Sequence, residues 1–211
     1  KSRTIKACVR GRMQKSRSSR RTQACVLAAP TGCASFQMKH GATTIHRAFG
    51  VPVGFCGPTR VKTSKHFLKR KHRLQAAELF VIDEFSMMGR QMLGKVDFKV
   101  QEALQVRGVP WKSWGGRDLI LAGDSKQAAA IGDEPLFRYG RYQGRGLNKP
   151  RTGKAPPGTP TMEDLTRRGE FIREELTDVV ILREVHRIEK ESGAGDEASA
   201  ELYAKEANTF L

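Results

Sequence analysis

The sequence predicts an α/β domain with a mainly parallel sheet flanked by helices, and three observations lead to this fold class. Short apolar runs rich in Val, Ile and Leu recur along the chain, as expected for strands buried on both faces. The intervals between them leave room for helices and crossovers, which parallel strands require. Several runs end directly in polar residues, and open α/β sheets bind ligands beyond the carboxyl ends of their strands.

The expected elements follow in order along the chain. Residues 3–13, "RTIKACVRGRM", are expected to be helical. Four strands are expected, at 24–29 "ACVLAA", 78–83 "ELFVID", 117–124 "RDLILAGD" and 178–185 "DVVILREV". Residues 139–162 are dense in Gly and Pro and predict a long surface connection. We expect one domain over residues 1–187 and a polar tail over residues 188–211.

Composition excludes several classes of protein. No apolar run approaches the roughly 18 residues that a membrane helix needs, and the arginine-rich N-terminus lacks the apolar segment of a signal peptide. The cysteines have neither C-x-x-C spacing nor matching histidines, which argues against both a zinc site and a disulfide framework. They are Cys8, Cys25, Cys33 and Cys56. Nothing in the sequence indicates an oligomeric state.

The excess of positive over negative charge is confined to the first part of the chain. The net charge is +16, and residues 1–77 contain 18 Lys and Arg but no Asp or Glu. Lys and Arg gain affinity for polyanions by displacing counterions from phosphates, so a nucleic acid is the expected partner. For the segment "RGRMQKSRSSRR" alone, a solubilising basic arm is the alternative.

Candidate catalytic residues follow two of the expected strands. Asp83 ends the strand at 78–83 and Glu84 follows it, while Gly123 and Asp124 end the strand at 117–124 and Gln127 follows shortly after. Together they match a nucleotide-hydrolysing site, in which one carboxylate holds Mg²⁺, one activates water and an amide detects the terminal phosphate. Two adjacent acids after an apolar run would, by themselves, also fit a structural role.

A nucleotide site also needs a phosphate loop, and the chain contains no complete G-x-x-x-x-G-K-[ST]. "RTGKAPPG" at residue 151 lacks the first glycine, the metal-binding hydroxyl and a preceding strand. The chain begins with Lys1 and Ser2, followed by the expected helix. We therefore expect the sequence to start inside a phosphate loop, truncated at its N-terminus; an arbitrary Lys-Ser start is the alternative.

Four segments resemble consecutive motifs of the petite-integration-frequency DNA helicases, superfamily-1 motors also found in Helitron transposons. They are "VLAAPTGCASFQMKHGATTIHRAFGVPVG", "ELFVIDEFSMMGRQMLGKVD", "GGRDLILAGDSKQAAAIGDEPLF" and "DVVILREVHR". The resemblance implies a RecA-like P-loop NTPase fold, with the first motor domain at residues 1–187. It also implies an ATP-dependent helicase moving 5′ to 3′ on single-stranded DNA, in repair, recombination or telomere maintenance.

The resemblance assigns roles to individual residues. Lys1 would contact the β and γ phosphates of ATP, and Ser2 and Asp83 would hold Mg²⁺. Glu84 would activate water, while Gln127 and Arg187 would contact the γ-phosphate. The segments "APTG" and "TTIH" resemble elements that touch single-stranded DNA, and their candidate residues are Thr31, Gly32, Thr43 and His46. Phe36 and Phe49 are expected in the core rather than as stacking platforms.

Two departures from the family pattern qualify these expectations. Ala128, Ala129 and Ala130 replace a Leu-Pro-Pro run after Gln127, which removes rigid φ angles from the loop that couples ATP to DNA. The family also has a second motor domain, for which the residues after Arg187 are too few, so we expect the chain to be a fragment. The alternative function is a catalytically dead remnant that binds nucleic acid through its basic half. Basic clusters favour the nucleus, with the mitochondrion as the alternative.

Overall fold

The computed structural model describes residues 2–18, 25–104, 112–137 and 158–182. Within α1, the side chains of residues 2, 3, 13 and 15–18 are outside this description. Contacts divide the chain into the units Lys1–Thr177 and Asp178–Leu211. Every element below belongs to the first unit. None of the described helices is both long enough and apolar enough to span a membrane.

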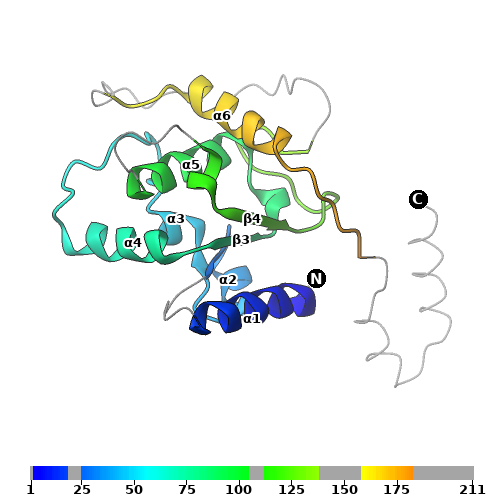
Figure 1. The fold of residues 1–211 in the computed structure, drawn as a ribbon. Coiled ribbons are helices and arrows are strands. Elements are labelled where there is room, and N and C mark those ends of the chain that lie inside the picture. The colour runs from blue at the N-terminus through cyan, green and yellow to red at the C-terminus, as the bar shows by residue number, and fades with distance from the viewer. Residues whose placement is uncertain (1, 19–24, 105–111, 138–157, 183–211) are drawn as a thin grey trace, which may run out of the picture. The chain divides into compact units, whose positions relative to one another are not determined.

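The centre of the first unit is a parallel sheet with the strand order β2-β1-β3-β4 (Figure 1). The strands are β1 (Cys25–Ala29), β2 (Thr43–Thr44), β3 (Leu79–Asp83) and β4 (Asp118–Ala122). Three of them fall within the segments expected from the apolar runs. The two-residue β2 was not expected, because so short a strand leaves no pattern in the sequence.

Helices cover both faces of this sheet. They are α1 (Ser2–Ser18), α2 (Gly32–Met38), α3 (Ile45–Phe49), α4 (Lys65–Ala76), α5 (Arg90–Leu104) and α6 (Met162–Glu174). Two short 3₁₀ helices, Phe85–Met87 and Ser113–Gly116, follow β3 and precede β4. In Figure 1, α1 and α2 lie on one side of the sheet and α5 on the other, with α6 packed outside α5. The described chain therefore forms the α/β architecture that the sequence predicts.

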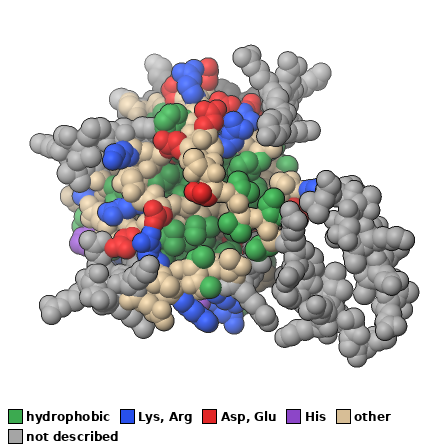
Figure 2. All heavy atoms as spheres, turned by 45° about the vertical axis from the view of Figure 1, so that its right-hand side comes forward, with side chains coloured by type: hydrophobic (Ala, Val, Ile, Leu, Met, Phe, Trp, Pro, Cys, Tyr) green, Lys and Arg blue, Asp and Glu red, His purple; other side chains and the backbone are tan. Residues whose placement is uncertain are grey.

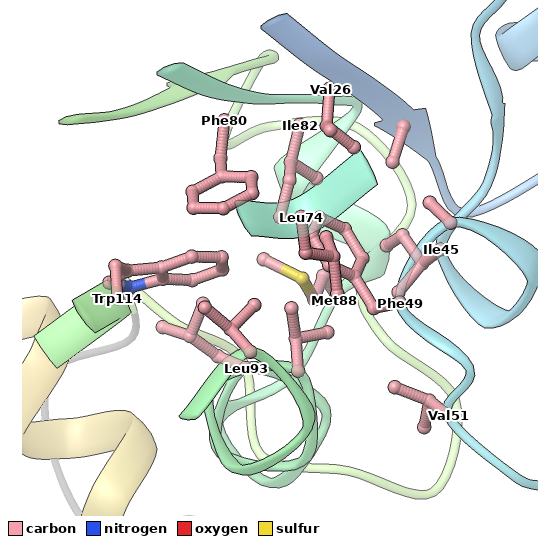
Figure 3. Close-up of a cluster of buried hydrophobic side chains, with 14 of the residues drawn as sticks. Val26, Ile45, Phe49, Val51, Leu74, Phe80, Ile82, Met88, Leu93 and Trp114 are labelled. Atoms are coloured by element: carbon pink, nitrogen blue, oxygen red, sulfur yellow. The ribbon is translucent and has the colours of Figure 1, made fainter. Parts of the chain in front are cut away.

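Alternation along the strands divides the core into two clusters. Val26 and Ala28 of β1 face α3, α4 and α5, whereas Leu27 and Ala29 face α1 and α2. The larger cluster contains the rings of Phe49, Phe80 and Trp114, whose centroids lie 5.5 to 6.1 Å apart (Figure 3). The smaller cluster includes Ile5 and Val9, which fasten α1 to the sheet.

Helix α6 lies against α5 at the distance of backbone contact. A Cβ atom on Gly94 of α5 would lie 2.8 Å from the carbonyl carbon of Leu165, and one on Gly169 of α6 would lie 2.7 Å from that of Arg90. The buried Asp97 carboxylate accepts the backbone N–H of Trp114 at 2.7 Å and pairs with Arg168 at 2.6 Å. Two glycines and one buried ion pair thus hold α6 in place.

Two expectations about the strands require correction. The run at 178–185 was expected to be a buried strand, but its described residues 178–182 form no strand and Val179 and Val180 are each 80% exposed. An apolar run becomes a strand only where a neighbouring strand accepts its hydrogen bonds, and the pattern does not show one. Second, β4 was expected to be buried on both faces, but its side chains are only partly buried. The surface connection expected at 139–162 is described only from residue 158, and the thirteen-residue α6 begins at its last residue, where Thr161 and Asp164 form a capping box.

Candidate functional site

The candidate site residues follow strands that end at the same edge of the sheet. Asp83 pairs in register with Ala122, and Ala29 pairs with Thr44, so the carboxyl ends of all four parallel strands are level. In Figure 2 the molecule is turned so that the right-hand side of Figure 1 comes forward. Acidic and apolar side chains mingle near its centre, and Lys and Arg side chains gather at the lower edge, on the side of α1 and α2.

Asp83 and Glu84 have different environments although they are adjacent. Asp83 is the last residue of β3 and only 6% exposed, and its Oδ1 accepts the Glu84 N–H at 2.9 Å. Glu84 adopts left-handed backbone angles, φ 56° and ψ 47°, which are costly for a residue with a Cβ atom. The chain therefore turns sharply at Glu84, so one carboxylate stays within the strand and the other lies in the turn. Such strain is concentrated at functional sites.

The end of β4 approaches this turn closely. A Cβ atom on Gly123 would lie 2.8 Å from both the backbone nitrogen and Cδ1 of Phe85, so a larger residue would force the two segments apart. The next four residues form a turn in which Asp124 accepts the Lys126 N–H at 2.9 Å through Oδ1 and the Gln127 N–H at 3.2 Å through its carbonyl. Gln127 is exposed and lies on the same edge as Asp83.

Asp133 fixes the far end of the Gln127 loop and was not singled out in the sequence. Its carboxylate accepts the backbone N–H groups of Gln91, Met92 and Glu134 at 2.8 to 3.0 Å, which caps the start of α5. Burial raises its pKa above the usual value despite these hydrogen bonds. Because the cap lies about forty residues from its helix, no local motif could reveal it. The Gln127 loop is thereby tied to β4 at one end and to α5 at the other.

The candidate DNA residues occupy the other half of the same edge. Thr31 and Gly32 follow β1, and Thr31 caps α2 by accepting the Ala34 N–H at 3.2 Å. Gly32 is exposed, and a Cβ atom there would meet nothing within 4 Å. Thr43 lies in β2, and the partly buried His46 lies in the first turn of α3. The backbone beside Gly32 is thus open to a close ligand.

The two phenylalanines of this region have opposite environments. Phe49 is fully buried in the larger core cluster, as expected. Phe36 is 85% exposed, so the expectation that it belongs to the core was wrong. Helix α2 buries only Ser35 and Met38, because its seven residues offer the sheet one narrow face. Phe36 lies one turn after Gly32, on the same side of α2.

Lys1 and Arg187 lie outside the described residues, and of Ser2 only its position at the start of α1 is described. Arg12 pairs with Asp118, the first residue of β4. The ten residues from Ser2 to Arg12 span about 15 Å of helix, about the length of β4. Helix α1 therefore runs antiparallel to the strands and begins near the edge where Asp83 lies, as Figure 1 also shows.

The donor set at this edge suits a hard cation such as Mg²⁺, because Asp83 contributes carboxylate oxygens. No group of three or more His, Cys, Asp or Glu side chains is arranged to hold a metal ion within the described part of the chain. Asp83 is therefore the described residue that fits the expected Mg²⁺, and the contribution of Ser2 falls on a side chain that the structure does not describe.

Comparisons with known proteins identify relatives of this chain. The model of the PIF1-like helicase family matches residues 3–136. The ATP-dependent DNA helicase PIF1 of Trypanosoma brucei brucei is 30% identical over 111 residues, which are 53% of this chain and 10% of that protein.

Solved structures of Pif1 from Bacteroides are similar to parts of the chain. The structure in complex with ADP-AlF3 and single-stranded DNA is 31% identical, with a TM-score of 0.43, and the match covers 51% of this chain and 24% of that one. The structure bound to single-stranded DNA is 28% identical, with a TM-score of 0.44 and coverages of 58% and 26%. The chain thus spans about a tenth of the curated relative and about a quarter of these solved chains.

Proposed function

Because this chain belongs to the PIF1-like helicase family, we propose that it is part of a motor that hydrolyses ATP and moves along single-stranded DNA. One observation carries the proposal: the order of the strands divides the edge of the sheet into two halves. Asp83 and Glu84 lie at the end of β3 and Gln127 lies after β4. Thr31 follows β1, and Thr43 lies in β2.

This division suits a motor that must couple two ligands. Adjacent strands lie about 4.8 Å apart, so the two halves are close enough for one to respond to the other. The N-terminal end of α1 points toward the same edge, and helix N-termini favour phosphate groups. ATP on the β3–β4 side and DNA on the β1–β2 side would therefore lie on one continuous surface.

Each described residue then has a role that its position supports. Asp83 holds Mg²⁺, which when bound neutralises charge on the phosphates. Glu84, in the turn, orients the attacking water and accepts its proton. Gln127 contacts the terminal phosphate. Movement of its loop after hydrolysis would reach α5 through the Asp133 cap. The alanines at 128–130 lie within that loop.

The finer proposals follow from family membership. We infer movement in the 5′ to 3′ direction and a role in DNA repair, recombination or telomere maintenance. The basic clusters of the first 77 residues support a location in the nucleus, with the mitochondrion as the alternative.

The test compares the adjacent carboxylates of Asp83 and Glu84. In the 211-residue chain, Glu84→Gln should leave ATP and Mg²⁺ bound and reduce DNA-stimulated hydrolysis by about 10²- to 10⁴-fold, because the amide cannot accept the proton. Asp83→Asn should instead weaken Mg²⁺-dependent ATP binding. Glu78→Gln is the matched control, since Glu78 precedes β3 at the opposite end and should leave both activities unchanged.

Steady-state hydrolysis and fluorescent-nucleotide binding distinguish the outcomes. Hydrolysis by Glu84→Gln at the parental rate would contradict the assignment of the base. Salt-sensitive DNA binding without any hydrolysis in the parental chain would favour the alternative, a remnant that binds nucleic acid through its basic half.

A further inference from the structure

Helix α4 carries positive charge that works against its own stability. Five of its twelve residues are Lys or Arg, none is acidic, and it has no acidic residue in its first turn. Lys65 occupies the first position, where the helix dipole disfavours a cation. Lys65, Lys69 and Arg73 follow one another at intervals of four residues, a spacing at which like charges repel. Because this arrangement disfavours the helix, an external anion is the natural explanation for it.

Among the described residues, ion pairs do not neutralise these cations, although burial lowers the pKa of Arg70 and the negative charge of Glu102 partly opposes that shift. Within the described residues, no carboxylate forms an ion pair with a side chain of α4. A helix face that is merely solvated gains from alternating charges, and α4 has none of the negative sign. In the described part of the chain, Lys65 and Lys69 therefore form no ion pair that would account for their charge.

The charge of α4 continues onto α3, toward the candidate DNA residues. Arg73 donates a hydrogen bond to the carbonyl of Ala48, which ties α4 to the end of α3. Burial lowers the pKa of Arg73, and the positive charges of Arg70 and Arg47 lower it further, so cations of both helices lie close together. Arg47 directly follows His46. A cationic surface thus runs from the DNA half of the sheet edge along α3 to α4.

A cavity of about 310 Å³ lies where α3 ends, within the range of ligand-binding pockets. Arg60, Arg70 and Gly50 are among its lining residues. The Arg70 side chain lies over the Phe67 ring, 5.2 Å from its centroid, and burial lowers its pKa. A phosphate in this cavity would accept hydrogen bonds from the Arg70 guanidinium and so offset the cost of burying its positive charge.

Hydrogen bonds within the protein fix the loop at residues 57–59, which lines the cavity. Glu102 accepts hydrogen bonds from the backbone N–H of Thr59 at 2.5 Å and from its hydroxyl at 2.6 Å. Lys99 donates to Gly57 at 2.7 Å, to Glu102 at 3.0 Å and to Thr59 at 3.2 Å. Since these three acceptors use all the protons of Lys99, the cations left for a ligand are Arg60 and Arg70.

We propose that α4 and this cavity form a second phosphate-binding surface, which takes the sugar–phosphate backbone of the DNA strand after it passes His46. This inference rests on the proposed function, because that function places DNA at His46. The twelve residues of α4 extend the path by about 18 Å. The surface would hold the strand without reading its bases, because Lys and Arg contacts to phosphate carry no sequence information.

The test uses matched pairs of substitutions in the full 211-residue chain and single-stranded oligonucleotides of about 6 and about 20 nucleotides. Lys65→Gln with Lys69→Gln removes two charges from α4. Lys112→Gln with Arg167→Gln removes two exposed charges outside it. For the longer strand, the α4 pair should lower the slope of log affinity against log salt by about 1.4, because each phosphate that a cation neutralises adds about 0.7 to that slope. The control pair should leave the slope unchanged.

The length of the oligonucleotide distinguishes failure of this inference from failure of the proposed function. The α4 pair should not change binding of the short oligonucleotide, which His46→Ala should weaken. Equal losses in the α4 and control pairs, or equal losses for both strand lengths, would overturn the second surface while leaving the proposed function standing. If the short strand does not bind the parental chain at all, the DNA half of the proposed function fails instead. Thermal unfolding should show no loss of stability in the α4 pair, because it relieves repulsion.

Discussion

Gly94→Ala tests the contact that holds α6 on α5. In an open helix this change would stabilise the protein by about 0.5–1 kcal/mol, since alanine is the better helix former. At Gly94 the new Cβ would lie 2.8 Å from the carbonyl carbon and 3.2 Å from the Cα of Leu165, and nearer still to the carbonyl oxygen. These are backbone atoms, so no side chain can rotate away and α6 itself must move.

The expected cost follows from this clash. Overpacking of a well-packed contact costs about 1–3 kcal/mol, which exceeds the gain in helix propensity. Complete displacement of α6 would set the upper limit of this cost. It would expose the side chains of Leu165 and Ile172, which are now 1% exposed and whose burial contributes about 1.5–3 kcal/mol each. We expect a net loss of about 2 kcal/mol in the free energy of unfolding.

Gly11→Ala is the matched control, because Gly11 lies within α1 and a Cβ atom there meets nothing within 4 Å. The same substitution should therefore change the free energy of unfolding in opposite directions at the two sites. In urea denaturation, a typical slope of about 2 kcal/mol per molar gives Gly94→Ala a midpoint about 1 M lower, and Gly11→Ala a slightly higher one. Equal shifts in the same direction, or a raised midpoint for Gly94→Ala, would refute the reasoning.

Two further predictions concern single buried or exposed side chains. Phe49→Ala should lower the free energy of unfolding by about 3–5 kcal/mol, because Phe49 is buried. Phe36→Ala should change it by less than about 0.5 kcal/mol, because Phe36 is exposed. Urea denaturation of both variants measures these changes, and similar losses would contradict the two environments. Burial raises the pKa of Asp97 above its ordinary 3.8, so its contribution to stability is greatest below that pH and falls as the pH rises through the folded pKa. Asp97→Asn should flatten that decline in thermal unfolding measured across the acidic range, and an unchanged pH profile would show that Asp97 does not titrate there.

The candidate site could be predicted from the sequence to the extent that it depends on strand ends. An apolar run followed by Asp83 and Glu84, and another followed by Gly123 and Asp124, put these residues on one edge once the strands are parallel. Local patterns could not give the left-handed turn at Glu84 or the cap from Asp133. The first lies beside the close approach of Gly123 to Phe85, and the second joins segments about forty residues apart.

The opposite environments of Phe36 and Phe49 illustrate the limit of the sequence for the core. Both lie in the same segment that resembles the family motifs, and both were expected in the core. Phe49 packs against Phe80 and Trp114 because α3 crosses that face of the sheet, whereas α2 turns Phe36 outward. The capping box at Thr161 and Asp164 is a different case, because that signal was present in the sequence and would have located the start of α6.

The sequence by itself determined the fold class, the confinement of excess positive charge to the first 77 residues and the family, because these depend on periodicity, composition and ordered motifs. Tertiary structure alone decided the strand order that separates the two halves of the edge, the backbone contact at Gly94 and the joining of the charges of α3 and α4. The physical reason is that local patterns fix which faces of an element are apolar. Which elements meet across those faces depends on packing between residues far apart in the chain.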